Sequence, residues 1–218
     1  MNPLLVKICG LSTPETVDAA VDSGADLIGF VFHPKSPRNV TPERAAALAE
    51  RARGRAKIVA LVVDASDDRL ETIDRVLRPD FWQAHGAEDV DRLRRIRATF
   101  GKPVIKAVGF SAPSDQDEAT RFAHHADMLL LDAKPPKDAA YPGGHGRPFD
   151  WRLLDNMGAD FILSGGLSPE NVGDAIRTMR TMGLNLAGVD VSSGVESAPG
   201  AKDIAKIRAF VAAARAAG

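Results

Sequence analysis

Eight short apolar segments that alternate with segments of helical character constrain the fold of this chain most. The predicted strands cover Leu4–Cys9, Asp26–Phe32, Lys57–Val63, Phe81–Ala84, Pro103–Val108 and Met128–Leu131, followed by two that begin near Asp160 and Leu186. Each is followed by a candidate helix, and no linker separates the units. Strands that alternate with helices form parallel sheets. Eight such units in 218 residues predict an α/β fold, a closed (β/α)8 barrel that occupies residues 1–218 as a single domain.

Several of the predicted helices begin with the same signature. Thr13–Glu15, Thr41–Glu43 and Ser168–Glu170 each place a hydroxyl residue, a proline and an acid in succession. The hydroxyl caps a helix, proline suits the first helical position, and an acid in the first turn interacts favourably with the helix dipole. We therefore expect a helix to begin at the proline of each signature. The other predicted helices are Asp67–Leu77, Glu88–Arg97, Asp115–His124, one near Asp150 and Ala201–Ala216.

Composition argues against several classes of protein. The formal net charge is −1 and the basic residues are spread along the chain, so we expect no binding to nucleic acid or to an anionic membrane. No apolar run reaches the length of a membrane span. A single cysteine, Cys9, excludes an internal disulfide and is typical of a cytoplasmic protein. The five histidines lack the spacing of zinc ligands, so no metal is expected.

The last two predicted strands each end in a turn of small residues. The first turn contains Gly165 and Gly166, and the second contains Ser192, Ser193 and Gly194. Glycine lets backbone N–H groups approach a ligand closely, and the start of a short helix offers free N–H groups and a positive dipole end. In (β/α)8 barrels the loops after strands 7 and 8 commonly bind phosphate. We therefore predict a phosphate site here; the alternative is that the glycines serve only tight turns.

Polar residues also mark the ends of other predicted strands, where the active sites of this architecture lie. Side-chain alternation in the first strand directs Lys7 and Cys9 into the barrel. Lys106 of the fifth strand is a second lysine that we expect to point inward. The polar residues expected at the barrel mouth are Cys9, Arg38, His85, Asp132 and Asp190. A ligand held by its phosphate at the last two strands could lie between Cys9 and Asp132.

Cys9 and Asp132 form a candidate acid–base pair. A thiolate is the reactive form of cysteine, and the ammonium of Lys7 would lower the pKa of the Cys9 thiol. An apolar enclosure raises the pKa of a carboxyl group, and Asp132 follows three leucines. The pair could therefore transfer protons near neutral pH.

Each candidate also has a purely structural interpretation, which the residues alone leave open. Cys9 could be an inert core residue, and Asp132 could cap a helix. Arg38 could be an ordinary surface residue, and His85 could belong to a turn. Lys7 and Lys106 could pair with Asp132 or Asp190 in a structural network.

The segment Ala133–Phe149 is the least regular part of the chain. It contains four prolines and three glycines. Long loops inside compact domains are usually functional or mobile. We therefore expect this segment to be a lid that changes conformation over a substrate.

The motifs at the strand ends resemble those of a known family. They are Val6–Leu11, Gly29–Phe32, Ser36–Arg38, Gln83–Gly86, Leu130–Asp132, Gly143–Gly146 with Phe149–Trp151, Leu163–Leu167 and Asp190–Glu196. In this order they resemble, over nearly the whole chain, the phosphoribosylanthranilate isomerases, the (βα)8 enzymes of tryptophan biosynthesis. The chain departs from the usual pattern at Ala84, where the family has an aliphatic residue, and at Ser164, where it has alanine. Ser164 would add a hydroxyl donor near the phosphate.

The resemblance implies an Amadori rearrangement, the third step of tryptophan biosynthesis from chorismate, without a cofactor. The residue matching Asp132 would protonate the furanose ring oxygen of N-(5-phosphoribosyl)anthranilate and open the ring to an iminium ion. The residue matching Cys9 would then remove the C2′ proton, and the enolamine would relax to 1-(o-carboxyphenylamino)-1-deoxyribulose 5-phosphate. Arg38 would bind the anthranilate carboxylate, since a planar guanidinium donates two parallel hydrogen bonds. Lys7, His85 and Asp190 would complete the substrate site.

Other hypotheses keep the same barrel. A ribulose-phosphate epimerase would need paired acidic and metal-binding residues at the mouth, and the sugar-phosphate isomerase of histidine biosynthesis would need an aspartate at the position of Cys9. A non-catalytic protein that binds a phosphate ligand would tolerate the loss of Cys9 or Asp132, yet both are present. The expected partner is a small phosphosugar substrate, and the sequence is compatible with a monomer or a homodimer.

Overall fold

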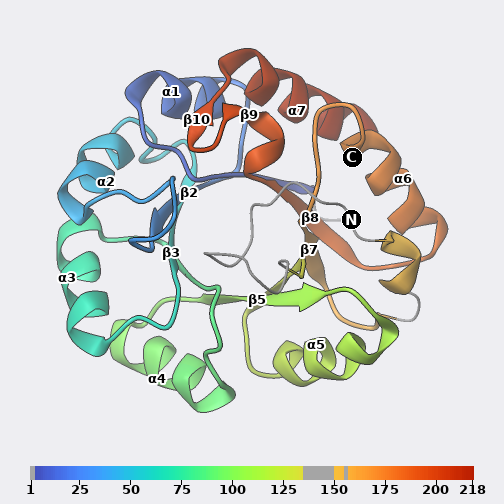
Figure 1. Ribbon diagram of the computed structural model, residues 1–218, viewed down its shortest axis with the longest axis horizontal. Helices are drawn as coiled ribbons and strands as arrows, with labels where there is room; N and C mark the ends of the chain where they lie inside the picture. Colours follow the sequence, from blue (N-terminus) through green and yellow to red (C-terminus); the bar gives the residue numbers. More distant parts are fainter. Residues whose placement is uncertain (1–2, 135–149, 155–156) are drawn as a thin grey trace.

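A closed barrel of eight parallel strands forms the centre of the computed structural model, which describes residues 3–134, 150–154 and 157–218 (Figure 1). The strands are β1 Leu5–Cys9, β2 Leu27–Phe32, β3 Lys57–Val62, β4 Phe81–Ala84, β5 Val104–Phe110, β6 Met128–Ala133, β7 Phe161–Leu163 and β8 Leu186–Val191. They lie around the barrel in chain order, and β1 closes it by pairing with β8. The predicted (β/α)8 barrel is confirmed.

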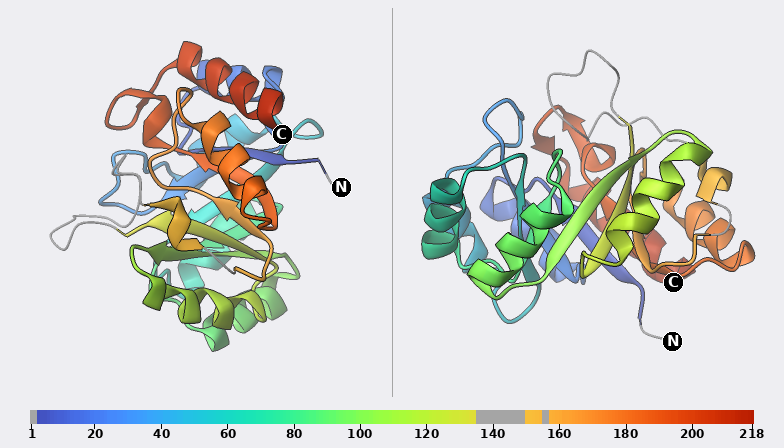
Figure 2. Two further views of the ribbon diagram at one scale, coloured as in Figure 1. Left: turned by 90° about the vertical axis from the view of Figure 1, so that its right-hand side faces the viewer. Right: turned by 90° about the horizontal axis from the view of Figure 1, so that it is seen from below.

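Helices form a ring around the strands, as the side views in Figure 2 also show. The α-helices are α1 Pro14–Asp22, α2 Pro42–Ala49, α3 Asp67–Leu77, α4 Val90–Phe100, α5 Gln116–Ala123, α6 Val172–Thr181 and α7 Ile204–Ala217. The shorter elements are the 3-10 helices η1 Pro113–Asp115, η2 Trp151–Leu154 and η3 Ser193–Val195, and a hairpin of β9 Glu196–Ala198 and β10 Ala201–Lys202. None of the described helices is long and apolar enough to cross a bilayer.

Two of the three predicted helix signatures are confirmed. The hydroxyls of Thr13 and Thr41 accept hydrogen bonds from backbone N–H groups in the first turns of α1 and α2, and proline opens each helix. The third prediction is wrong, because α6 begins only at Val172. The Asn171 side chain instead accepts from the Ser168 N–H at 2.8 Å and donates to the Gly166 carbonyl at 2.9 Å, so these residues form a turn before the helix.

Two other predicted helices differ from the structure by more than a few terminal residues. The last helix was expected from residue 201, but residues 201–202 pair with β9, and Asp203 caps α7 by accepting from the Lys206 N–H at 3.0 Å. The described residues near 150 form the single-turn helix η2 and not an α-helix. The predicted lid at 133–149 lies mostly outside the described residues.

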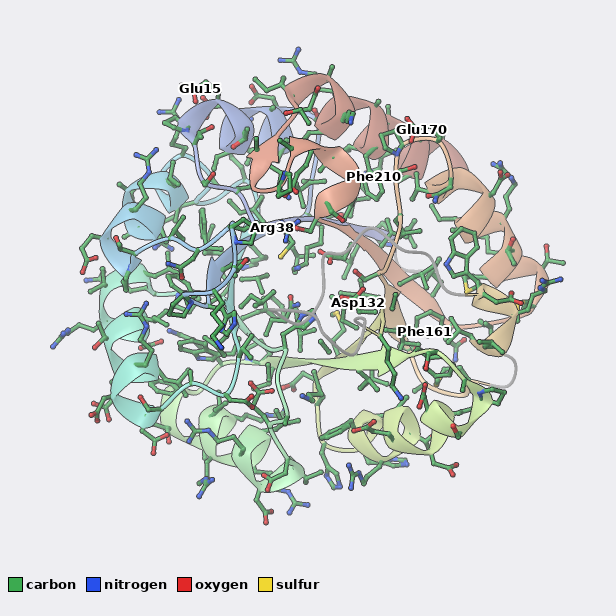
Figure 3. All side chains as sticks on the ribbon, in the orientation of Figure 1. Glu15, Arg38, Asp132, Phe161, Glu170 and Phe210 are labelled. Atoms are coloured by element: carbon green, nitrogen blue, oxygen red, sulfur yellow. The ribbon has the colours of Figure 1, made fainter. Side chains whose placement is uncertain are left out.

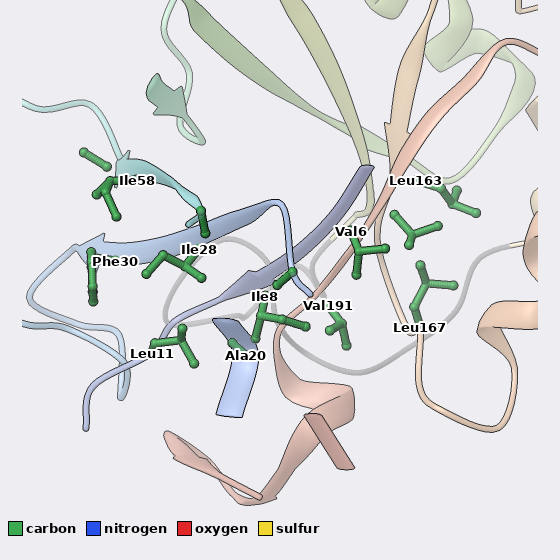
Figure 4. Packing of buried hydrophobic residues seen from close by; sticks show 14 of the residues in the cluster. Val6, Ile8, Leu11, Ala20, Ile28, Phe30, Ile58, Leu163, Leu167 and Val191 are labelled. Atoms are coloured by element: carbon green, nitrogen blue, oxygen red, sulfur yellow. The ribbon is translucent and has the colours of Figure 1, made fainter. Parts of the chain in front are cut away.

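The apolar side chains form an outer layer between strands and helices and an inner filling of the barrel. Val6 and Ile8 of β1 belong to the outer layer (Figure 4). Cys9 packs inside the barrel with Val31 and Leu61. Alternation along β1 therefore directs Lys7 and Cys9 inward, as predicted.

The expected inward direction of Lys106 is wrong. Its strand neighbours Ile105 and Ala107 belong to the inner filling, so Lys106 lies on the helix-facing side of β5. There Nζ lies 5.3 Å from the centre of the Phe122 ring and donates to Oε2 of Glu88 at 3.0 Å. This lysine is part of the packing between the barrel and α5, outside the barrel mouth.

Candidate active site

The predicted site residues gather at the carboxyl ends of the strands. Figure 3 shows Arg38 and Asp132 inside the ring of helices, whereas Glu15 lies at its outer edge. Both Arg38 and Asp132 are buried, so neither is an ordinary surface residue. The position agrees with the place where (β/α)8 barrels carry their chemistry.

Lys7 and Asp190 form a buried ion pair where β1 meets β8. The two residues are register partners, and Nζ of Lys7 lies 2.7 Å from Oδ1 of Asp190. Burial by itself would lower the pKa of Lys7, but Asp190 and the nearby Cys9 outweigh it and the pKa is raised. Lys7 therefore favours its ammonium form close to Cys9. The sequence left open whether Lys7 pairs with Asp132 or Asp190, and the structure shows the pair with Asp190.

Ser164 contacts the same carboxylate. Its hydroxyl donates to Oδ2 of Asp190 at 3.1 Å, and both side chains are buried. Ser164 thus completes the hydrogen bonding of Asp190 inside the barrel, where the sequence suggested a donor for the phosphate. The two oxygens of Asp190 are held by one ammonium and one hydroxyl.

The environment of Cys9 raises the pKa of its thiol, contrary to the sequence-based expectation. Burial is the largest cause, and Asp190 adds to it, while Lys7 and Lys202 act in the opposite direction. The sulfur packs closely against β2, because a Cβ added at Gly29 would lie 2.8 Å from Sγ. Lys7 does favour the thiolate, as predicted, but its effect is smaller than that of burial.

His85 and Asp132 are in contact across the mouth. Nε2 of His85 lies 3.3 Å from Oδ2 of Asp132, while Oδ1 accepts from the Ala133 N–H at 2.8 Å. On the far side of the ring, Nδ1 of His85 lies 2.9 Å from Nε2 of Gln83. These side chains form a hydrogen-bonded row from Gln83 to Asp132. Asp132 is therefore not a helix cap, and His85 does more than form a turn.

Arg38 is held by the carboxylate of Glu196, which was not among the predicted site residues. Its Nε and Nη2 donate to the two carboxylate oxygens of Glu196 at 2.7 and 2.9 Å. Glu196 also accepts from Nζ of Lys202 at 2.7 Å. Burial would raise the pKa of Glu196, but Arg38 and Lys202 outweigh it and hold the pKa below its ordinary value. The paired, bidentate geometry holds the guanidinium plane in one orientation.

The two turns of small residues lie against each other and against Asp132. A Cβ at Gly194 would lie 1.8 Å from the Leu167 carbonyl oxygen, so the turn after β8 packs directly on the turn after β7. Gly165 has a φ of +80°, and a Cβ there would meet the backbone nitrogen of Ala133 at 2.4 Å. The short helix expected at Ser193 is present as η3. Gly165, Gly166, Ser192, Ser193 and Gly194 therefore belong to one surface.

Within the described residues, no group of three His, Cys, Asp or Glu side chains is arranged to hold a metal ion. The site offers instead a buried thiol, a carboxyl group and three buried cations, Lys7, Arg38 and Lys202. Such a set of side chains can move protons and hold anions.

Comparison with known proteins identifies the family. The model of N-(5′-phosphoribosyl)anthranilate (PRA) isomerase matches residues 6–213. The chain belongs to this family. A phosphoribosylanthranilate isomerase of Nitrobacter winogradskyi is 55% identical over 216 residues, which are 98% of this chain and 94% of that protein. The predicted family, and with it the isomerase class, are confirmed.

Solved structures of phosphoribosylanthranilate isomerases superpose closely on the chain. The enzyme of Thermotoga maritima is 36% identical and has a TM-score of 0.86, covering 98% of this chain and 100% of that structure. Another, 34% identical with a TM-score of 0.83 and the same coverage, was solved in complex with reduced 1-(o-carboxyphenylamino)-1-deoxyribulose 5-phosphate.

Proposed function

We propose that this chain catalyses the Amadori rearrangement of N-(5′-phosphoribosyl)anthranilate, a step of tryptophan biosynthesis. Family membership supports the reaction, and the ligand of the 34% identical relative is a reduced form of the product. The observation that carries the proposal is the arrangement at the mouth: Cys9 stands at the end of β1 next to the cation Lys7, and Asp132 stands near the end of β6 against His85.

Asp132 is proposed as the general acid. Its protonated carboxyl donates to the furanose ring oxygen, the C1′–O bond breaks, and the anthranilate nitrogen supplies the electron pair that forms the iminium ion. Oδ1 accepts from the Ala133 N–H and Oδ2 contacts His85, so the carboxyl group is held in one orientation at the mouth. A general acid positioned in this way typically contributes about 100- to 10,000-fold in rate.

Cys9 is proposed as the general base. Its thiolate takes the proton from C2′, the electron pair of the C–H bond neutralises the iminium nitrogen, and the enolamine then tautomerises to the ketone. Lys7 supports the negative sulfur, and Asp190 keeps Lys7 in place at 2.7 Å. The reaction balances without an external oxidant or reductant because hydrogen only moves within the substrate.

The two ends of the substrate are proposed to be held by the cations and turns of the mouth. Arg38, oriented by Glu196, suits the planar anthranilate carboxylate. The joined turns at Gly165–Gly166 and Ser192–Gly194 suit the phosphate, because small residues let backbone groups approach it. A sugar bound in this way spans the barrel mouth between Cys9 and Asp132.

A fluorescence assay tests the proposal, since phosphoribosylanthranilate loses its emission on conversion. We expect the parent protein to abolish the emission and Cys9→Ser and Asp132→Asn to reduce kcat by at least about 100-fold. If both variants turned over at the parent rate, the proton-transfer roles would be wrong. Binding without turnover by the parent protein would instead support a non-catalytic phosphate-ligand protein.

The proposal also covers the cellular compartment and the oligomeric state of the protein: a cytoplasmic monomer or homodimer. A lone buried cysteine suits the cytoplasm. A Thermotoga maritima structure is described as monomers generated from a dimeric phosphoribosylanthranilate isomerase, so one fold supports both a monomer and a homodimer. Sedimentation of the purified chain at several concentrations decides between them.

A further inference from the structure

Lys202 is a buried lysine to which the proposed reaction gives no role. Its side chain is 1% exposed and projects from β10 behind the turn that follows β8. Nζ lies 2.8 Å from the carbonyl oxygen of Ser192, 3.1 Å from the Ser192 hydroxyl and 2.7 Å from Oε1 of Glu196. An ammonium has three N–H groups. These contacts use all three, so Lys202 has none left for a ligand and acts through the groups that it contacts.

The contact with Lys202 determines in which direction the Ser192 hydroxyl accepts and donates hydrogen bonds. A hydroxyl donates one hydrogen and accepts through its lone pairs. An ammonium has no lone pair, so the Ser192 oxygen accepts from Lys202 and its own hydrogen points elsewhere. Ser192 immediately precedes η3, and Gly194 packs on the turn after β7. The hydroxyl hydrogen is therefore directed away from Lys202 and can be donated to a ligand.

We propose that Lys202 is a positioning residue, whose ammonium makes the Ser192 hydroxyl a hydrogen-bond donor to the substrate phosphate and, through Glu196, ties the phosphate turn to Arg38. The inference rests on the proposed function, since it assigns the phosphate to this surface. In this arrangement the buried ion cluster of Arg38, Glu196 and Lys202 links the two proposed anion-binding ends of the site. Arg38, Glu196, Lys202 and Ser192 form a continuous row of hydrogen bonds.

The cluster also makes phosphate binding sensitive to alkaline pH. Burial lowers the pKa of Lys202 to about 8, against the opposing effect of Glu196, while Arg38 lowers it further and Cys9 raises it. Lys206 of α7 also faces the cluster and donates to the Glu196 carbonyl. A neutral amine has a lone pair, so the Ser192 hydroxyl can donate to Lys202 above this pH. The phosphate then loses its donor.

Sulfate binding by calorimetry tests the inference, because the charge of sulfate is constant over the alkaline range. The measurements use the full chain with Cys9→Ser, so that the thiol does not titrate. With Lys202 intact, affinity should fall as pH rises through about 8. Lys202→Met should weaken binding at pH 7 by about tenfold or more and remove the pH dependence, because the Ser192 hydroxyl loses the ammonium that orients it toward the anion. Lys57→Met, at an exposed lysine at the start of β3 that pairs with Asp80, is the control and should keep both the affinity and the pH dependence.

Ser192→Ala provides a second, milder variant in case Lys202→Met disturbs folding. It should reproduce the weaker and pH-independent binding, and the double variant should bind no worse than either single one. Additive losses, or a Lys202→Met protein that binds sulfate like its parent, would overturn the role of Lys202. If even the chain with Lys202 intact binds neither sulfate nor ribose 5-phosphate, the phosphate site itself is wrong. In turnover, the Lys202→Met change should raise KM and leave kcat nearly unchanged.

Discussion

Nε2 of His85 lies 3.3 Å from Oδ2 of Asp132, and the opposite ring nitrogen lies 2.9 Å from the amide nitrogen of Gln83. If Gln83 donates to Nδ1, a neutral His85 carries its hydrogen on Nε2 and donates to Asp132. The Gln83 carbonyl oxygen is buried and has no partner among the described residues. The reverse orientation would bury two N–H groups without partners, which is the more costly arrangement. Gln83 therefore selects the tautomer of His85.

The first prediction follows from this row of hydrogen bonds. His85→Ala should lower kcat by about 10- to 100-fold with little change in KM, because Oδ2 of Asp132 loses its only side-chain partner in the described part of the chain. Gln83→Met should lower kcat less and mix the two tautomers, which nitrogen-15 NMR of the ring reports independently of activity. Parent-like kcat in His85→Ala, or an unchanged tautomer in Gln83→Met, would contradict the assignment.

The second prediction concerns the ionisation of Cys9. The chain has one cysteine, so the ultraviolet absorbance of thiolate reports this residue alone. We expect a titration midpoint above the ordinary value of 9.0, because burial outweighs the cations Lys7 and Lys202. A raised folded-state pKa means that this contribution to stability is present below the unfolded pKa and is lost as pH rises through the folded value. The free energy of unfolding should therefore fall at alkaline pH more in the parent than in Cys9→Ala. A midpoint below 9.0 would show that the cations dominate.

How far the sequence predicts this structure depends on whether the determining contacts are local. The caps at Thr13 and Thr41 involve residues three positions apart, and both were predicted. The capping signature at Ser168 fails because the Asn171 side chain binds back to the turn instead. Local signals are thus reliable until a neighbouring side chain offers the backbone a competing partner.

The face of a strand on which a side chain lies is harder to predict when the residues of both faces are apolar. Lys106 stands in the run Val104–Val108, whose other members are all apolar, so no alternation fixes which face it takes. Its acceptor Glu88 lies in the β4–α4 connection, and this contact becomes visible only in three dimensions. In β1 the same uncertainty was resolved correctly because Lys7 and Cys9 alternate with Val6 and Ile8.

The missed site residues are those whose partners are distant in the chain. Arg38 and Glu196 are separated by 158 positions. Glu196 follows the predicted phosphate turn directly, and Lys202 follows soon after. These charges beside a turn of small residues were the available signal. Gln83 lies two residues before His85, and this spacing was the available signal that the two side chains share a face.

The third prediction tests the buried carboxylate between two cations. Glu196→Gln keeps the shape but removes the charge that holds Arg38 and Lys202. We expect KM to rise and the free energy of unfolding to fall by about 3–5 kcal/mol, the usual cost of leaving buried charges without their partner. The pKa of Glu196 is lowered on folding, so its contribution is present above the unfolded value of 4.5 and is lost as pH falls through the lower folded value. Denaturation at several pH values should show that the difference in the free energy of unfolding between the parent and Glu196→Gln becomes smaller as pH falls. If this difference were the same at all pH values, the lowered pKa of Glu196 would not contribute to stability as expected.

The fourth prediction concerns the contact that joins the two phosphate turns. A Cβ at Gly194 would lie 1.8 Å from the Leu167 carbonyl oxygen, which is backbone and cannot rotate away. Gly194→Ala must therefore separate the turns, and we expect both a loss of at least about 1–3 kcal/mol in the free energy of unfolding and weaker sulfate binding. Gly173→Ala in α6 is the matched control, because the added carbon would meet only the flexible end of Arg177, at 3.3 Å. That variant should be neutral or stabilising by about 0.5–1 kcal/mol, since alanine favours a helix. Equal stability and sulfate affinity in the Gly194→Ala protein and its parent would mean that the turns separate at no cost, and close packing between them would then not be what shapes the phosphate site.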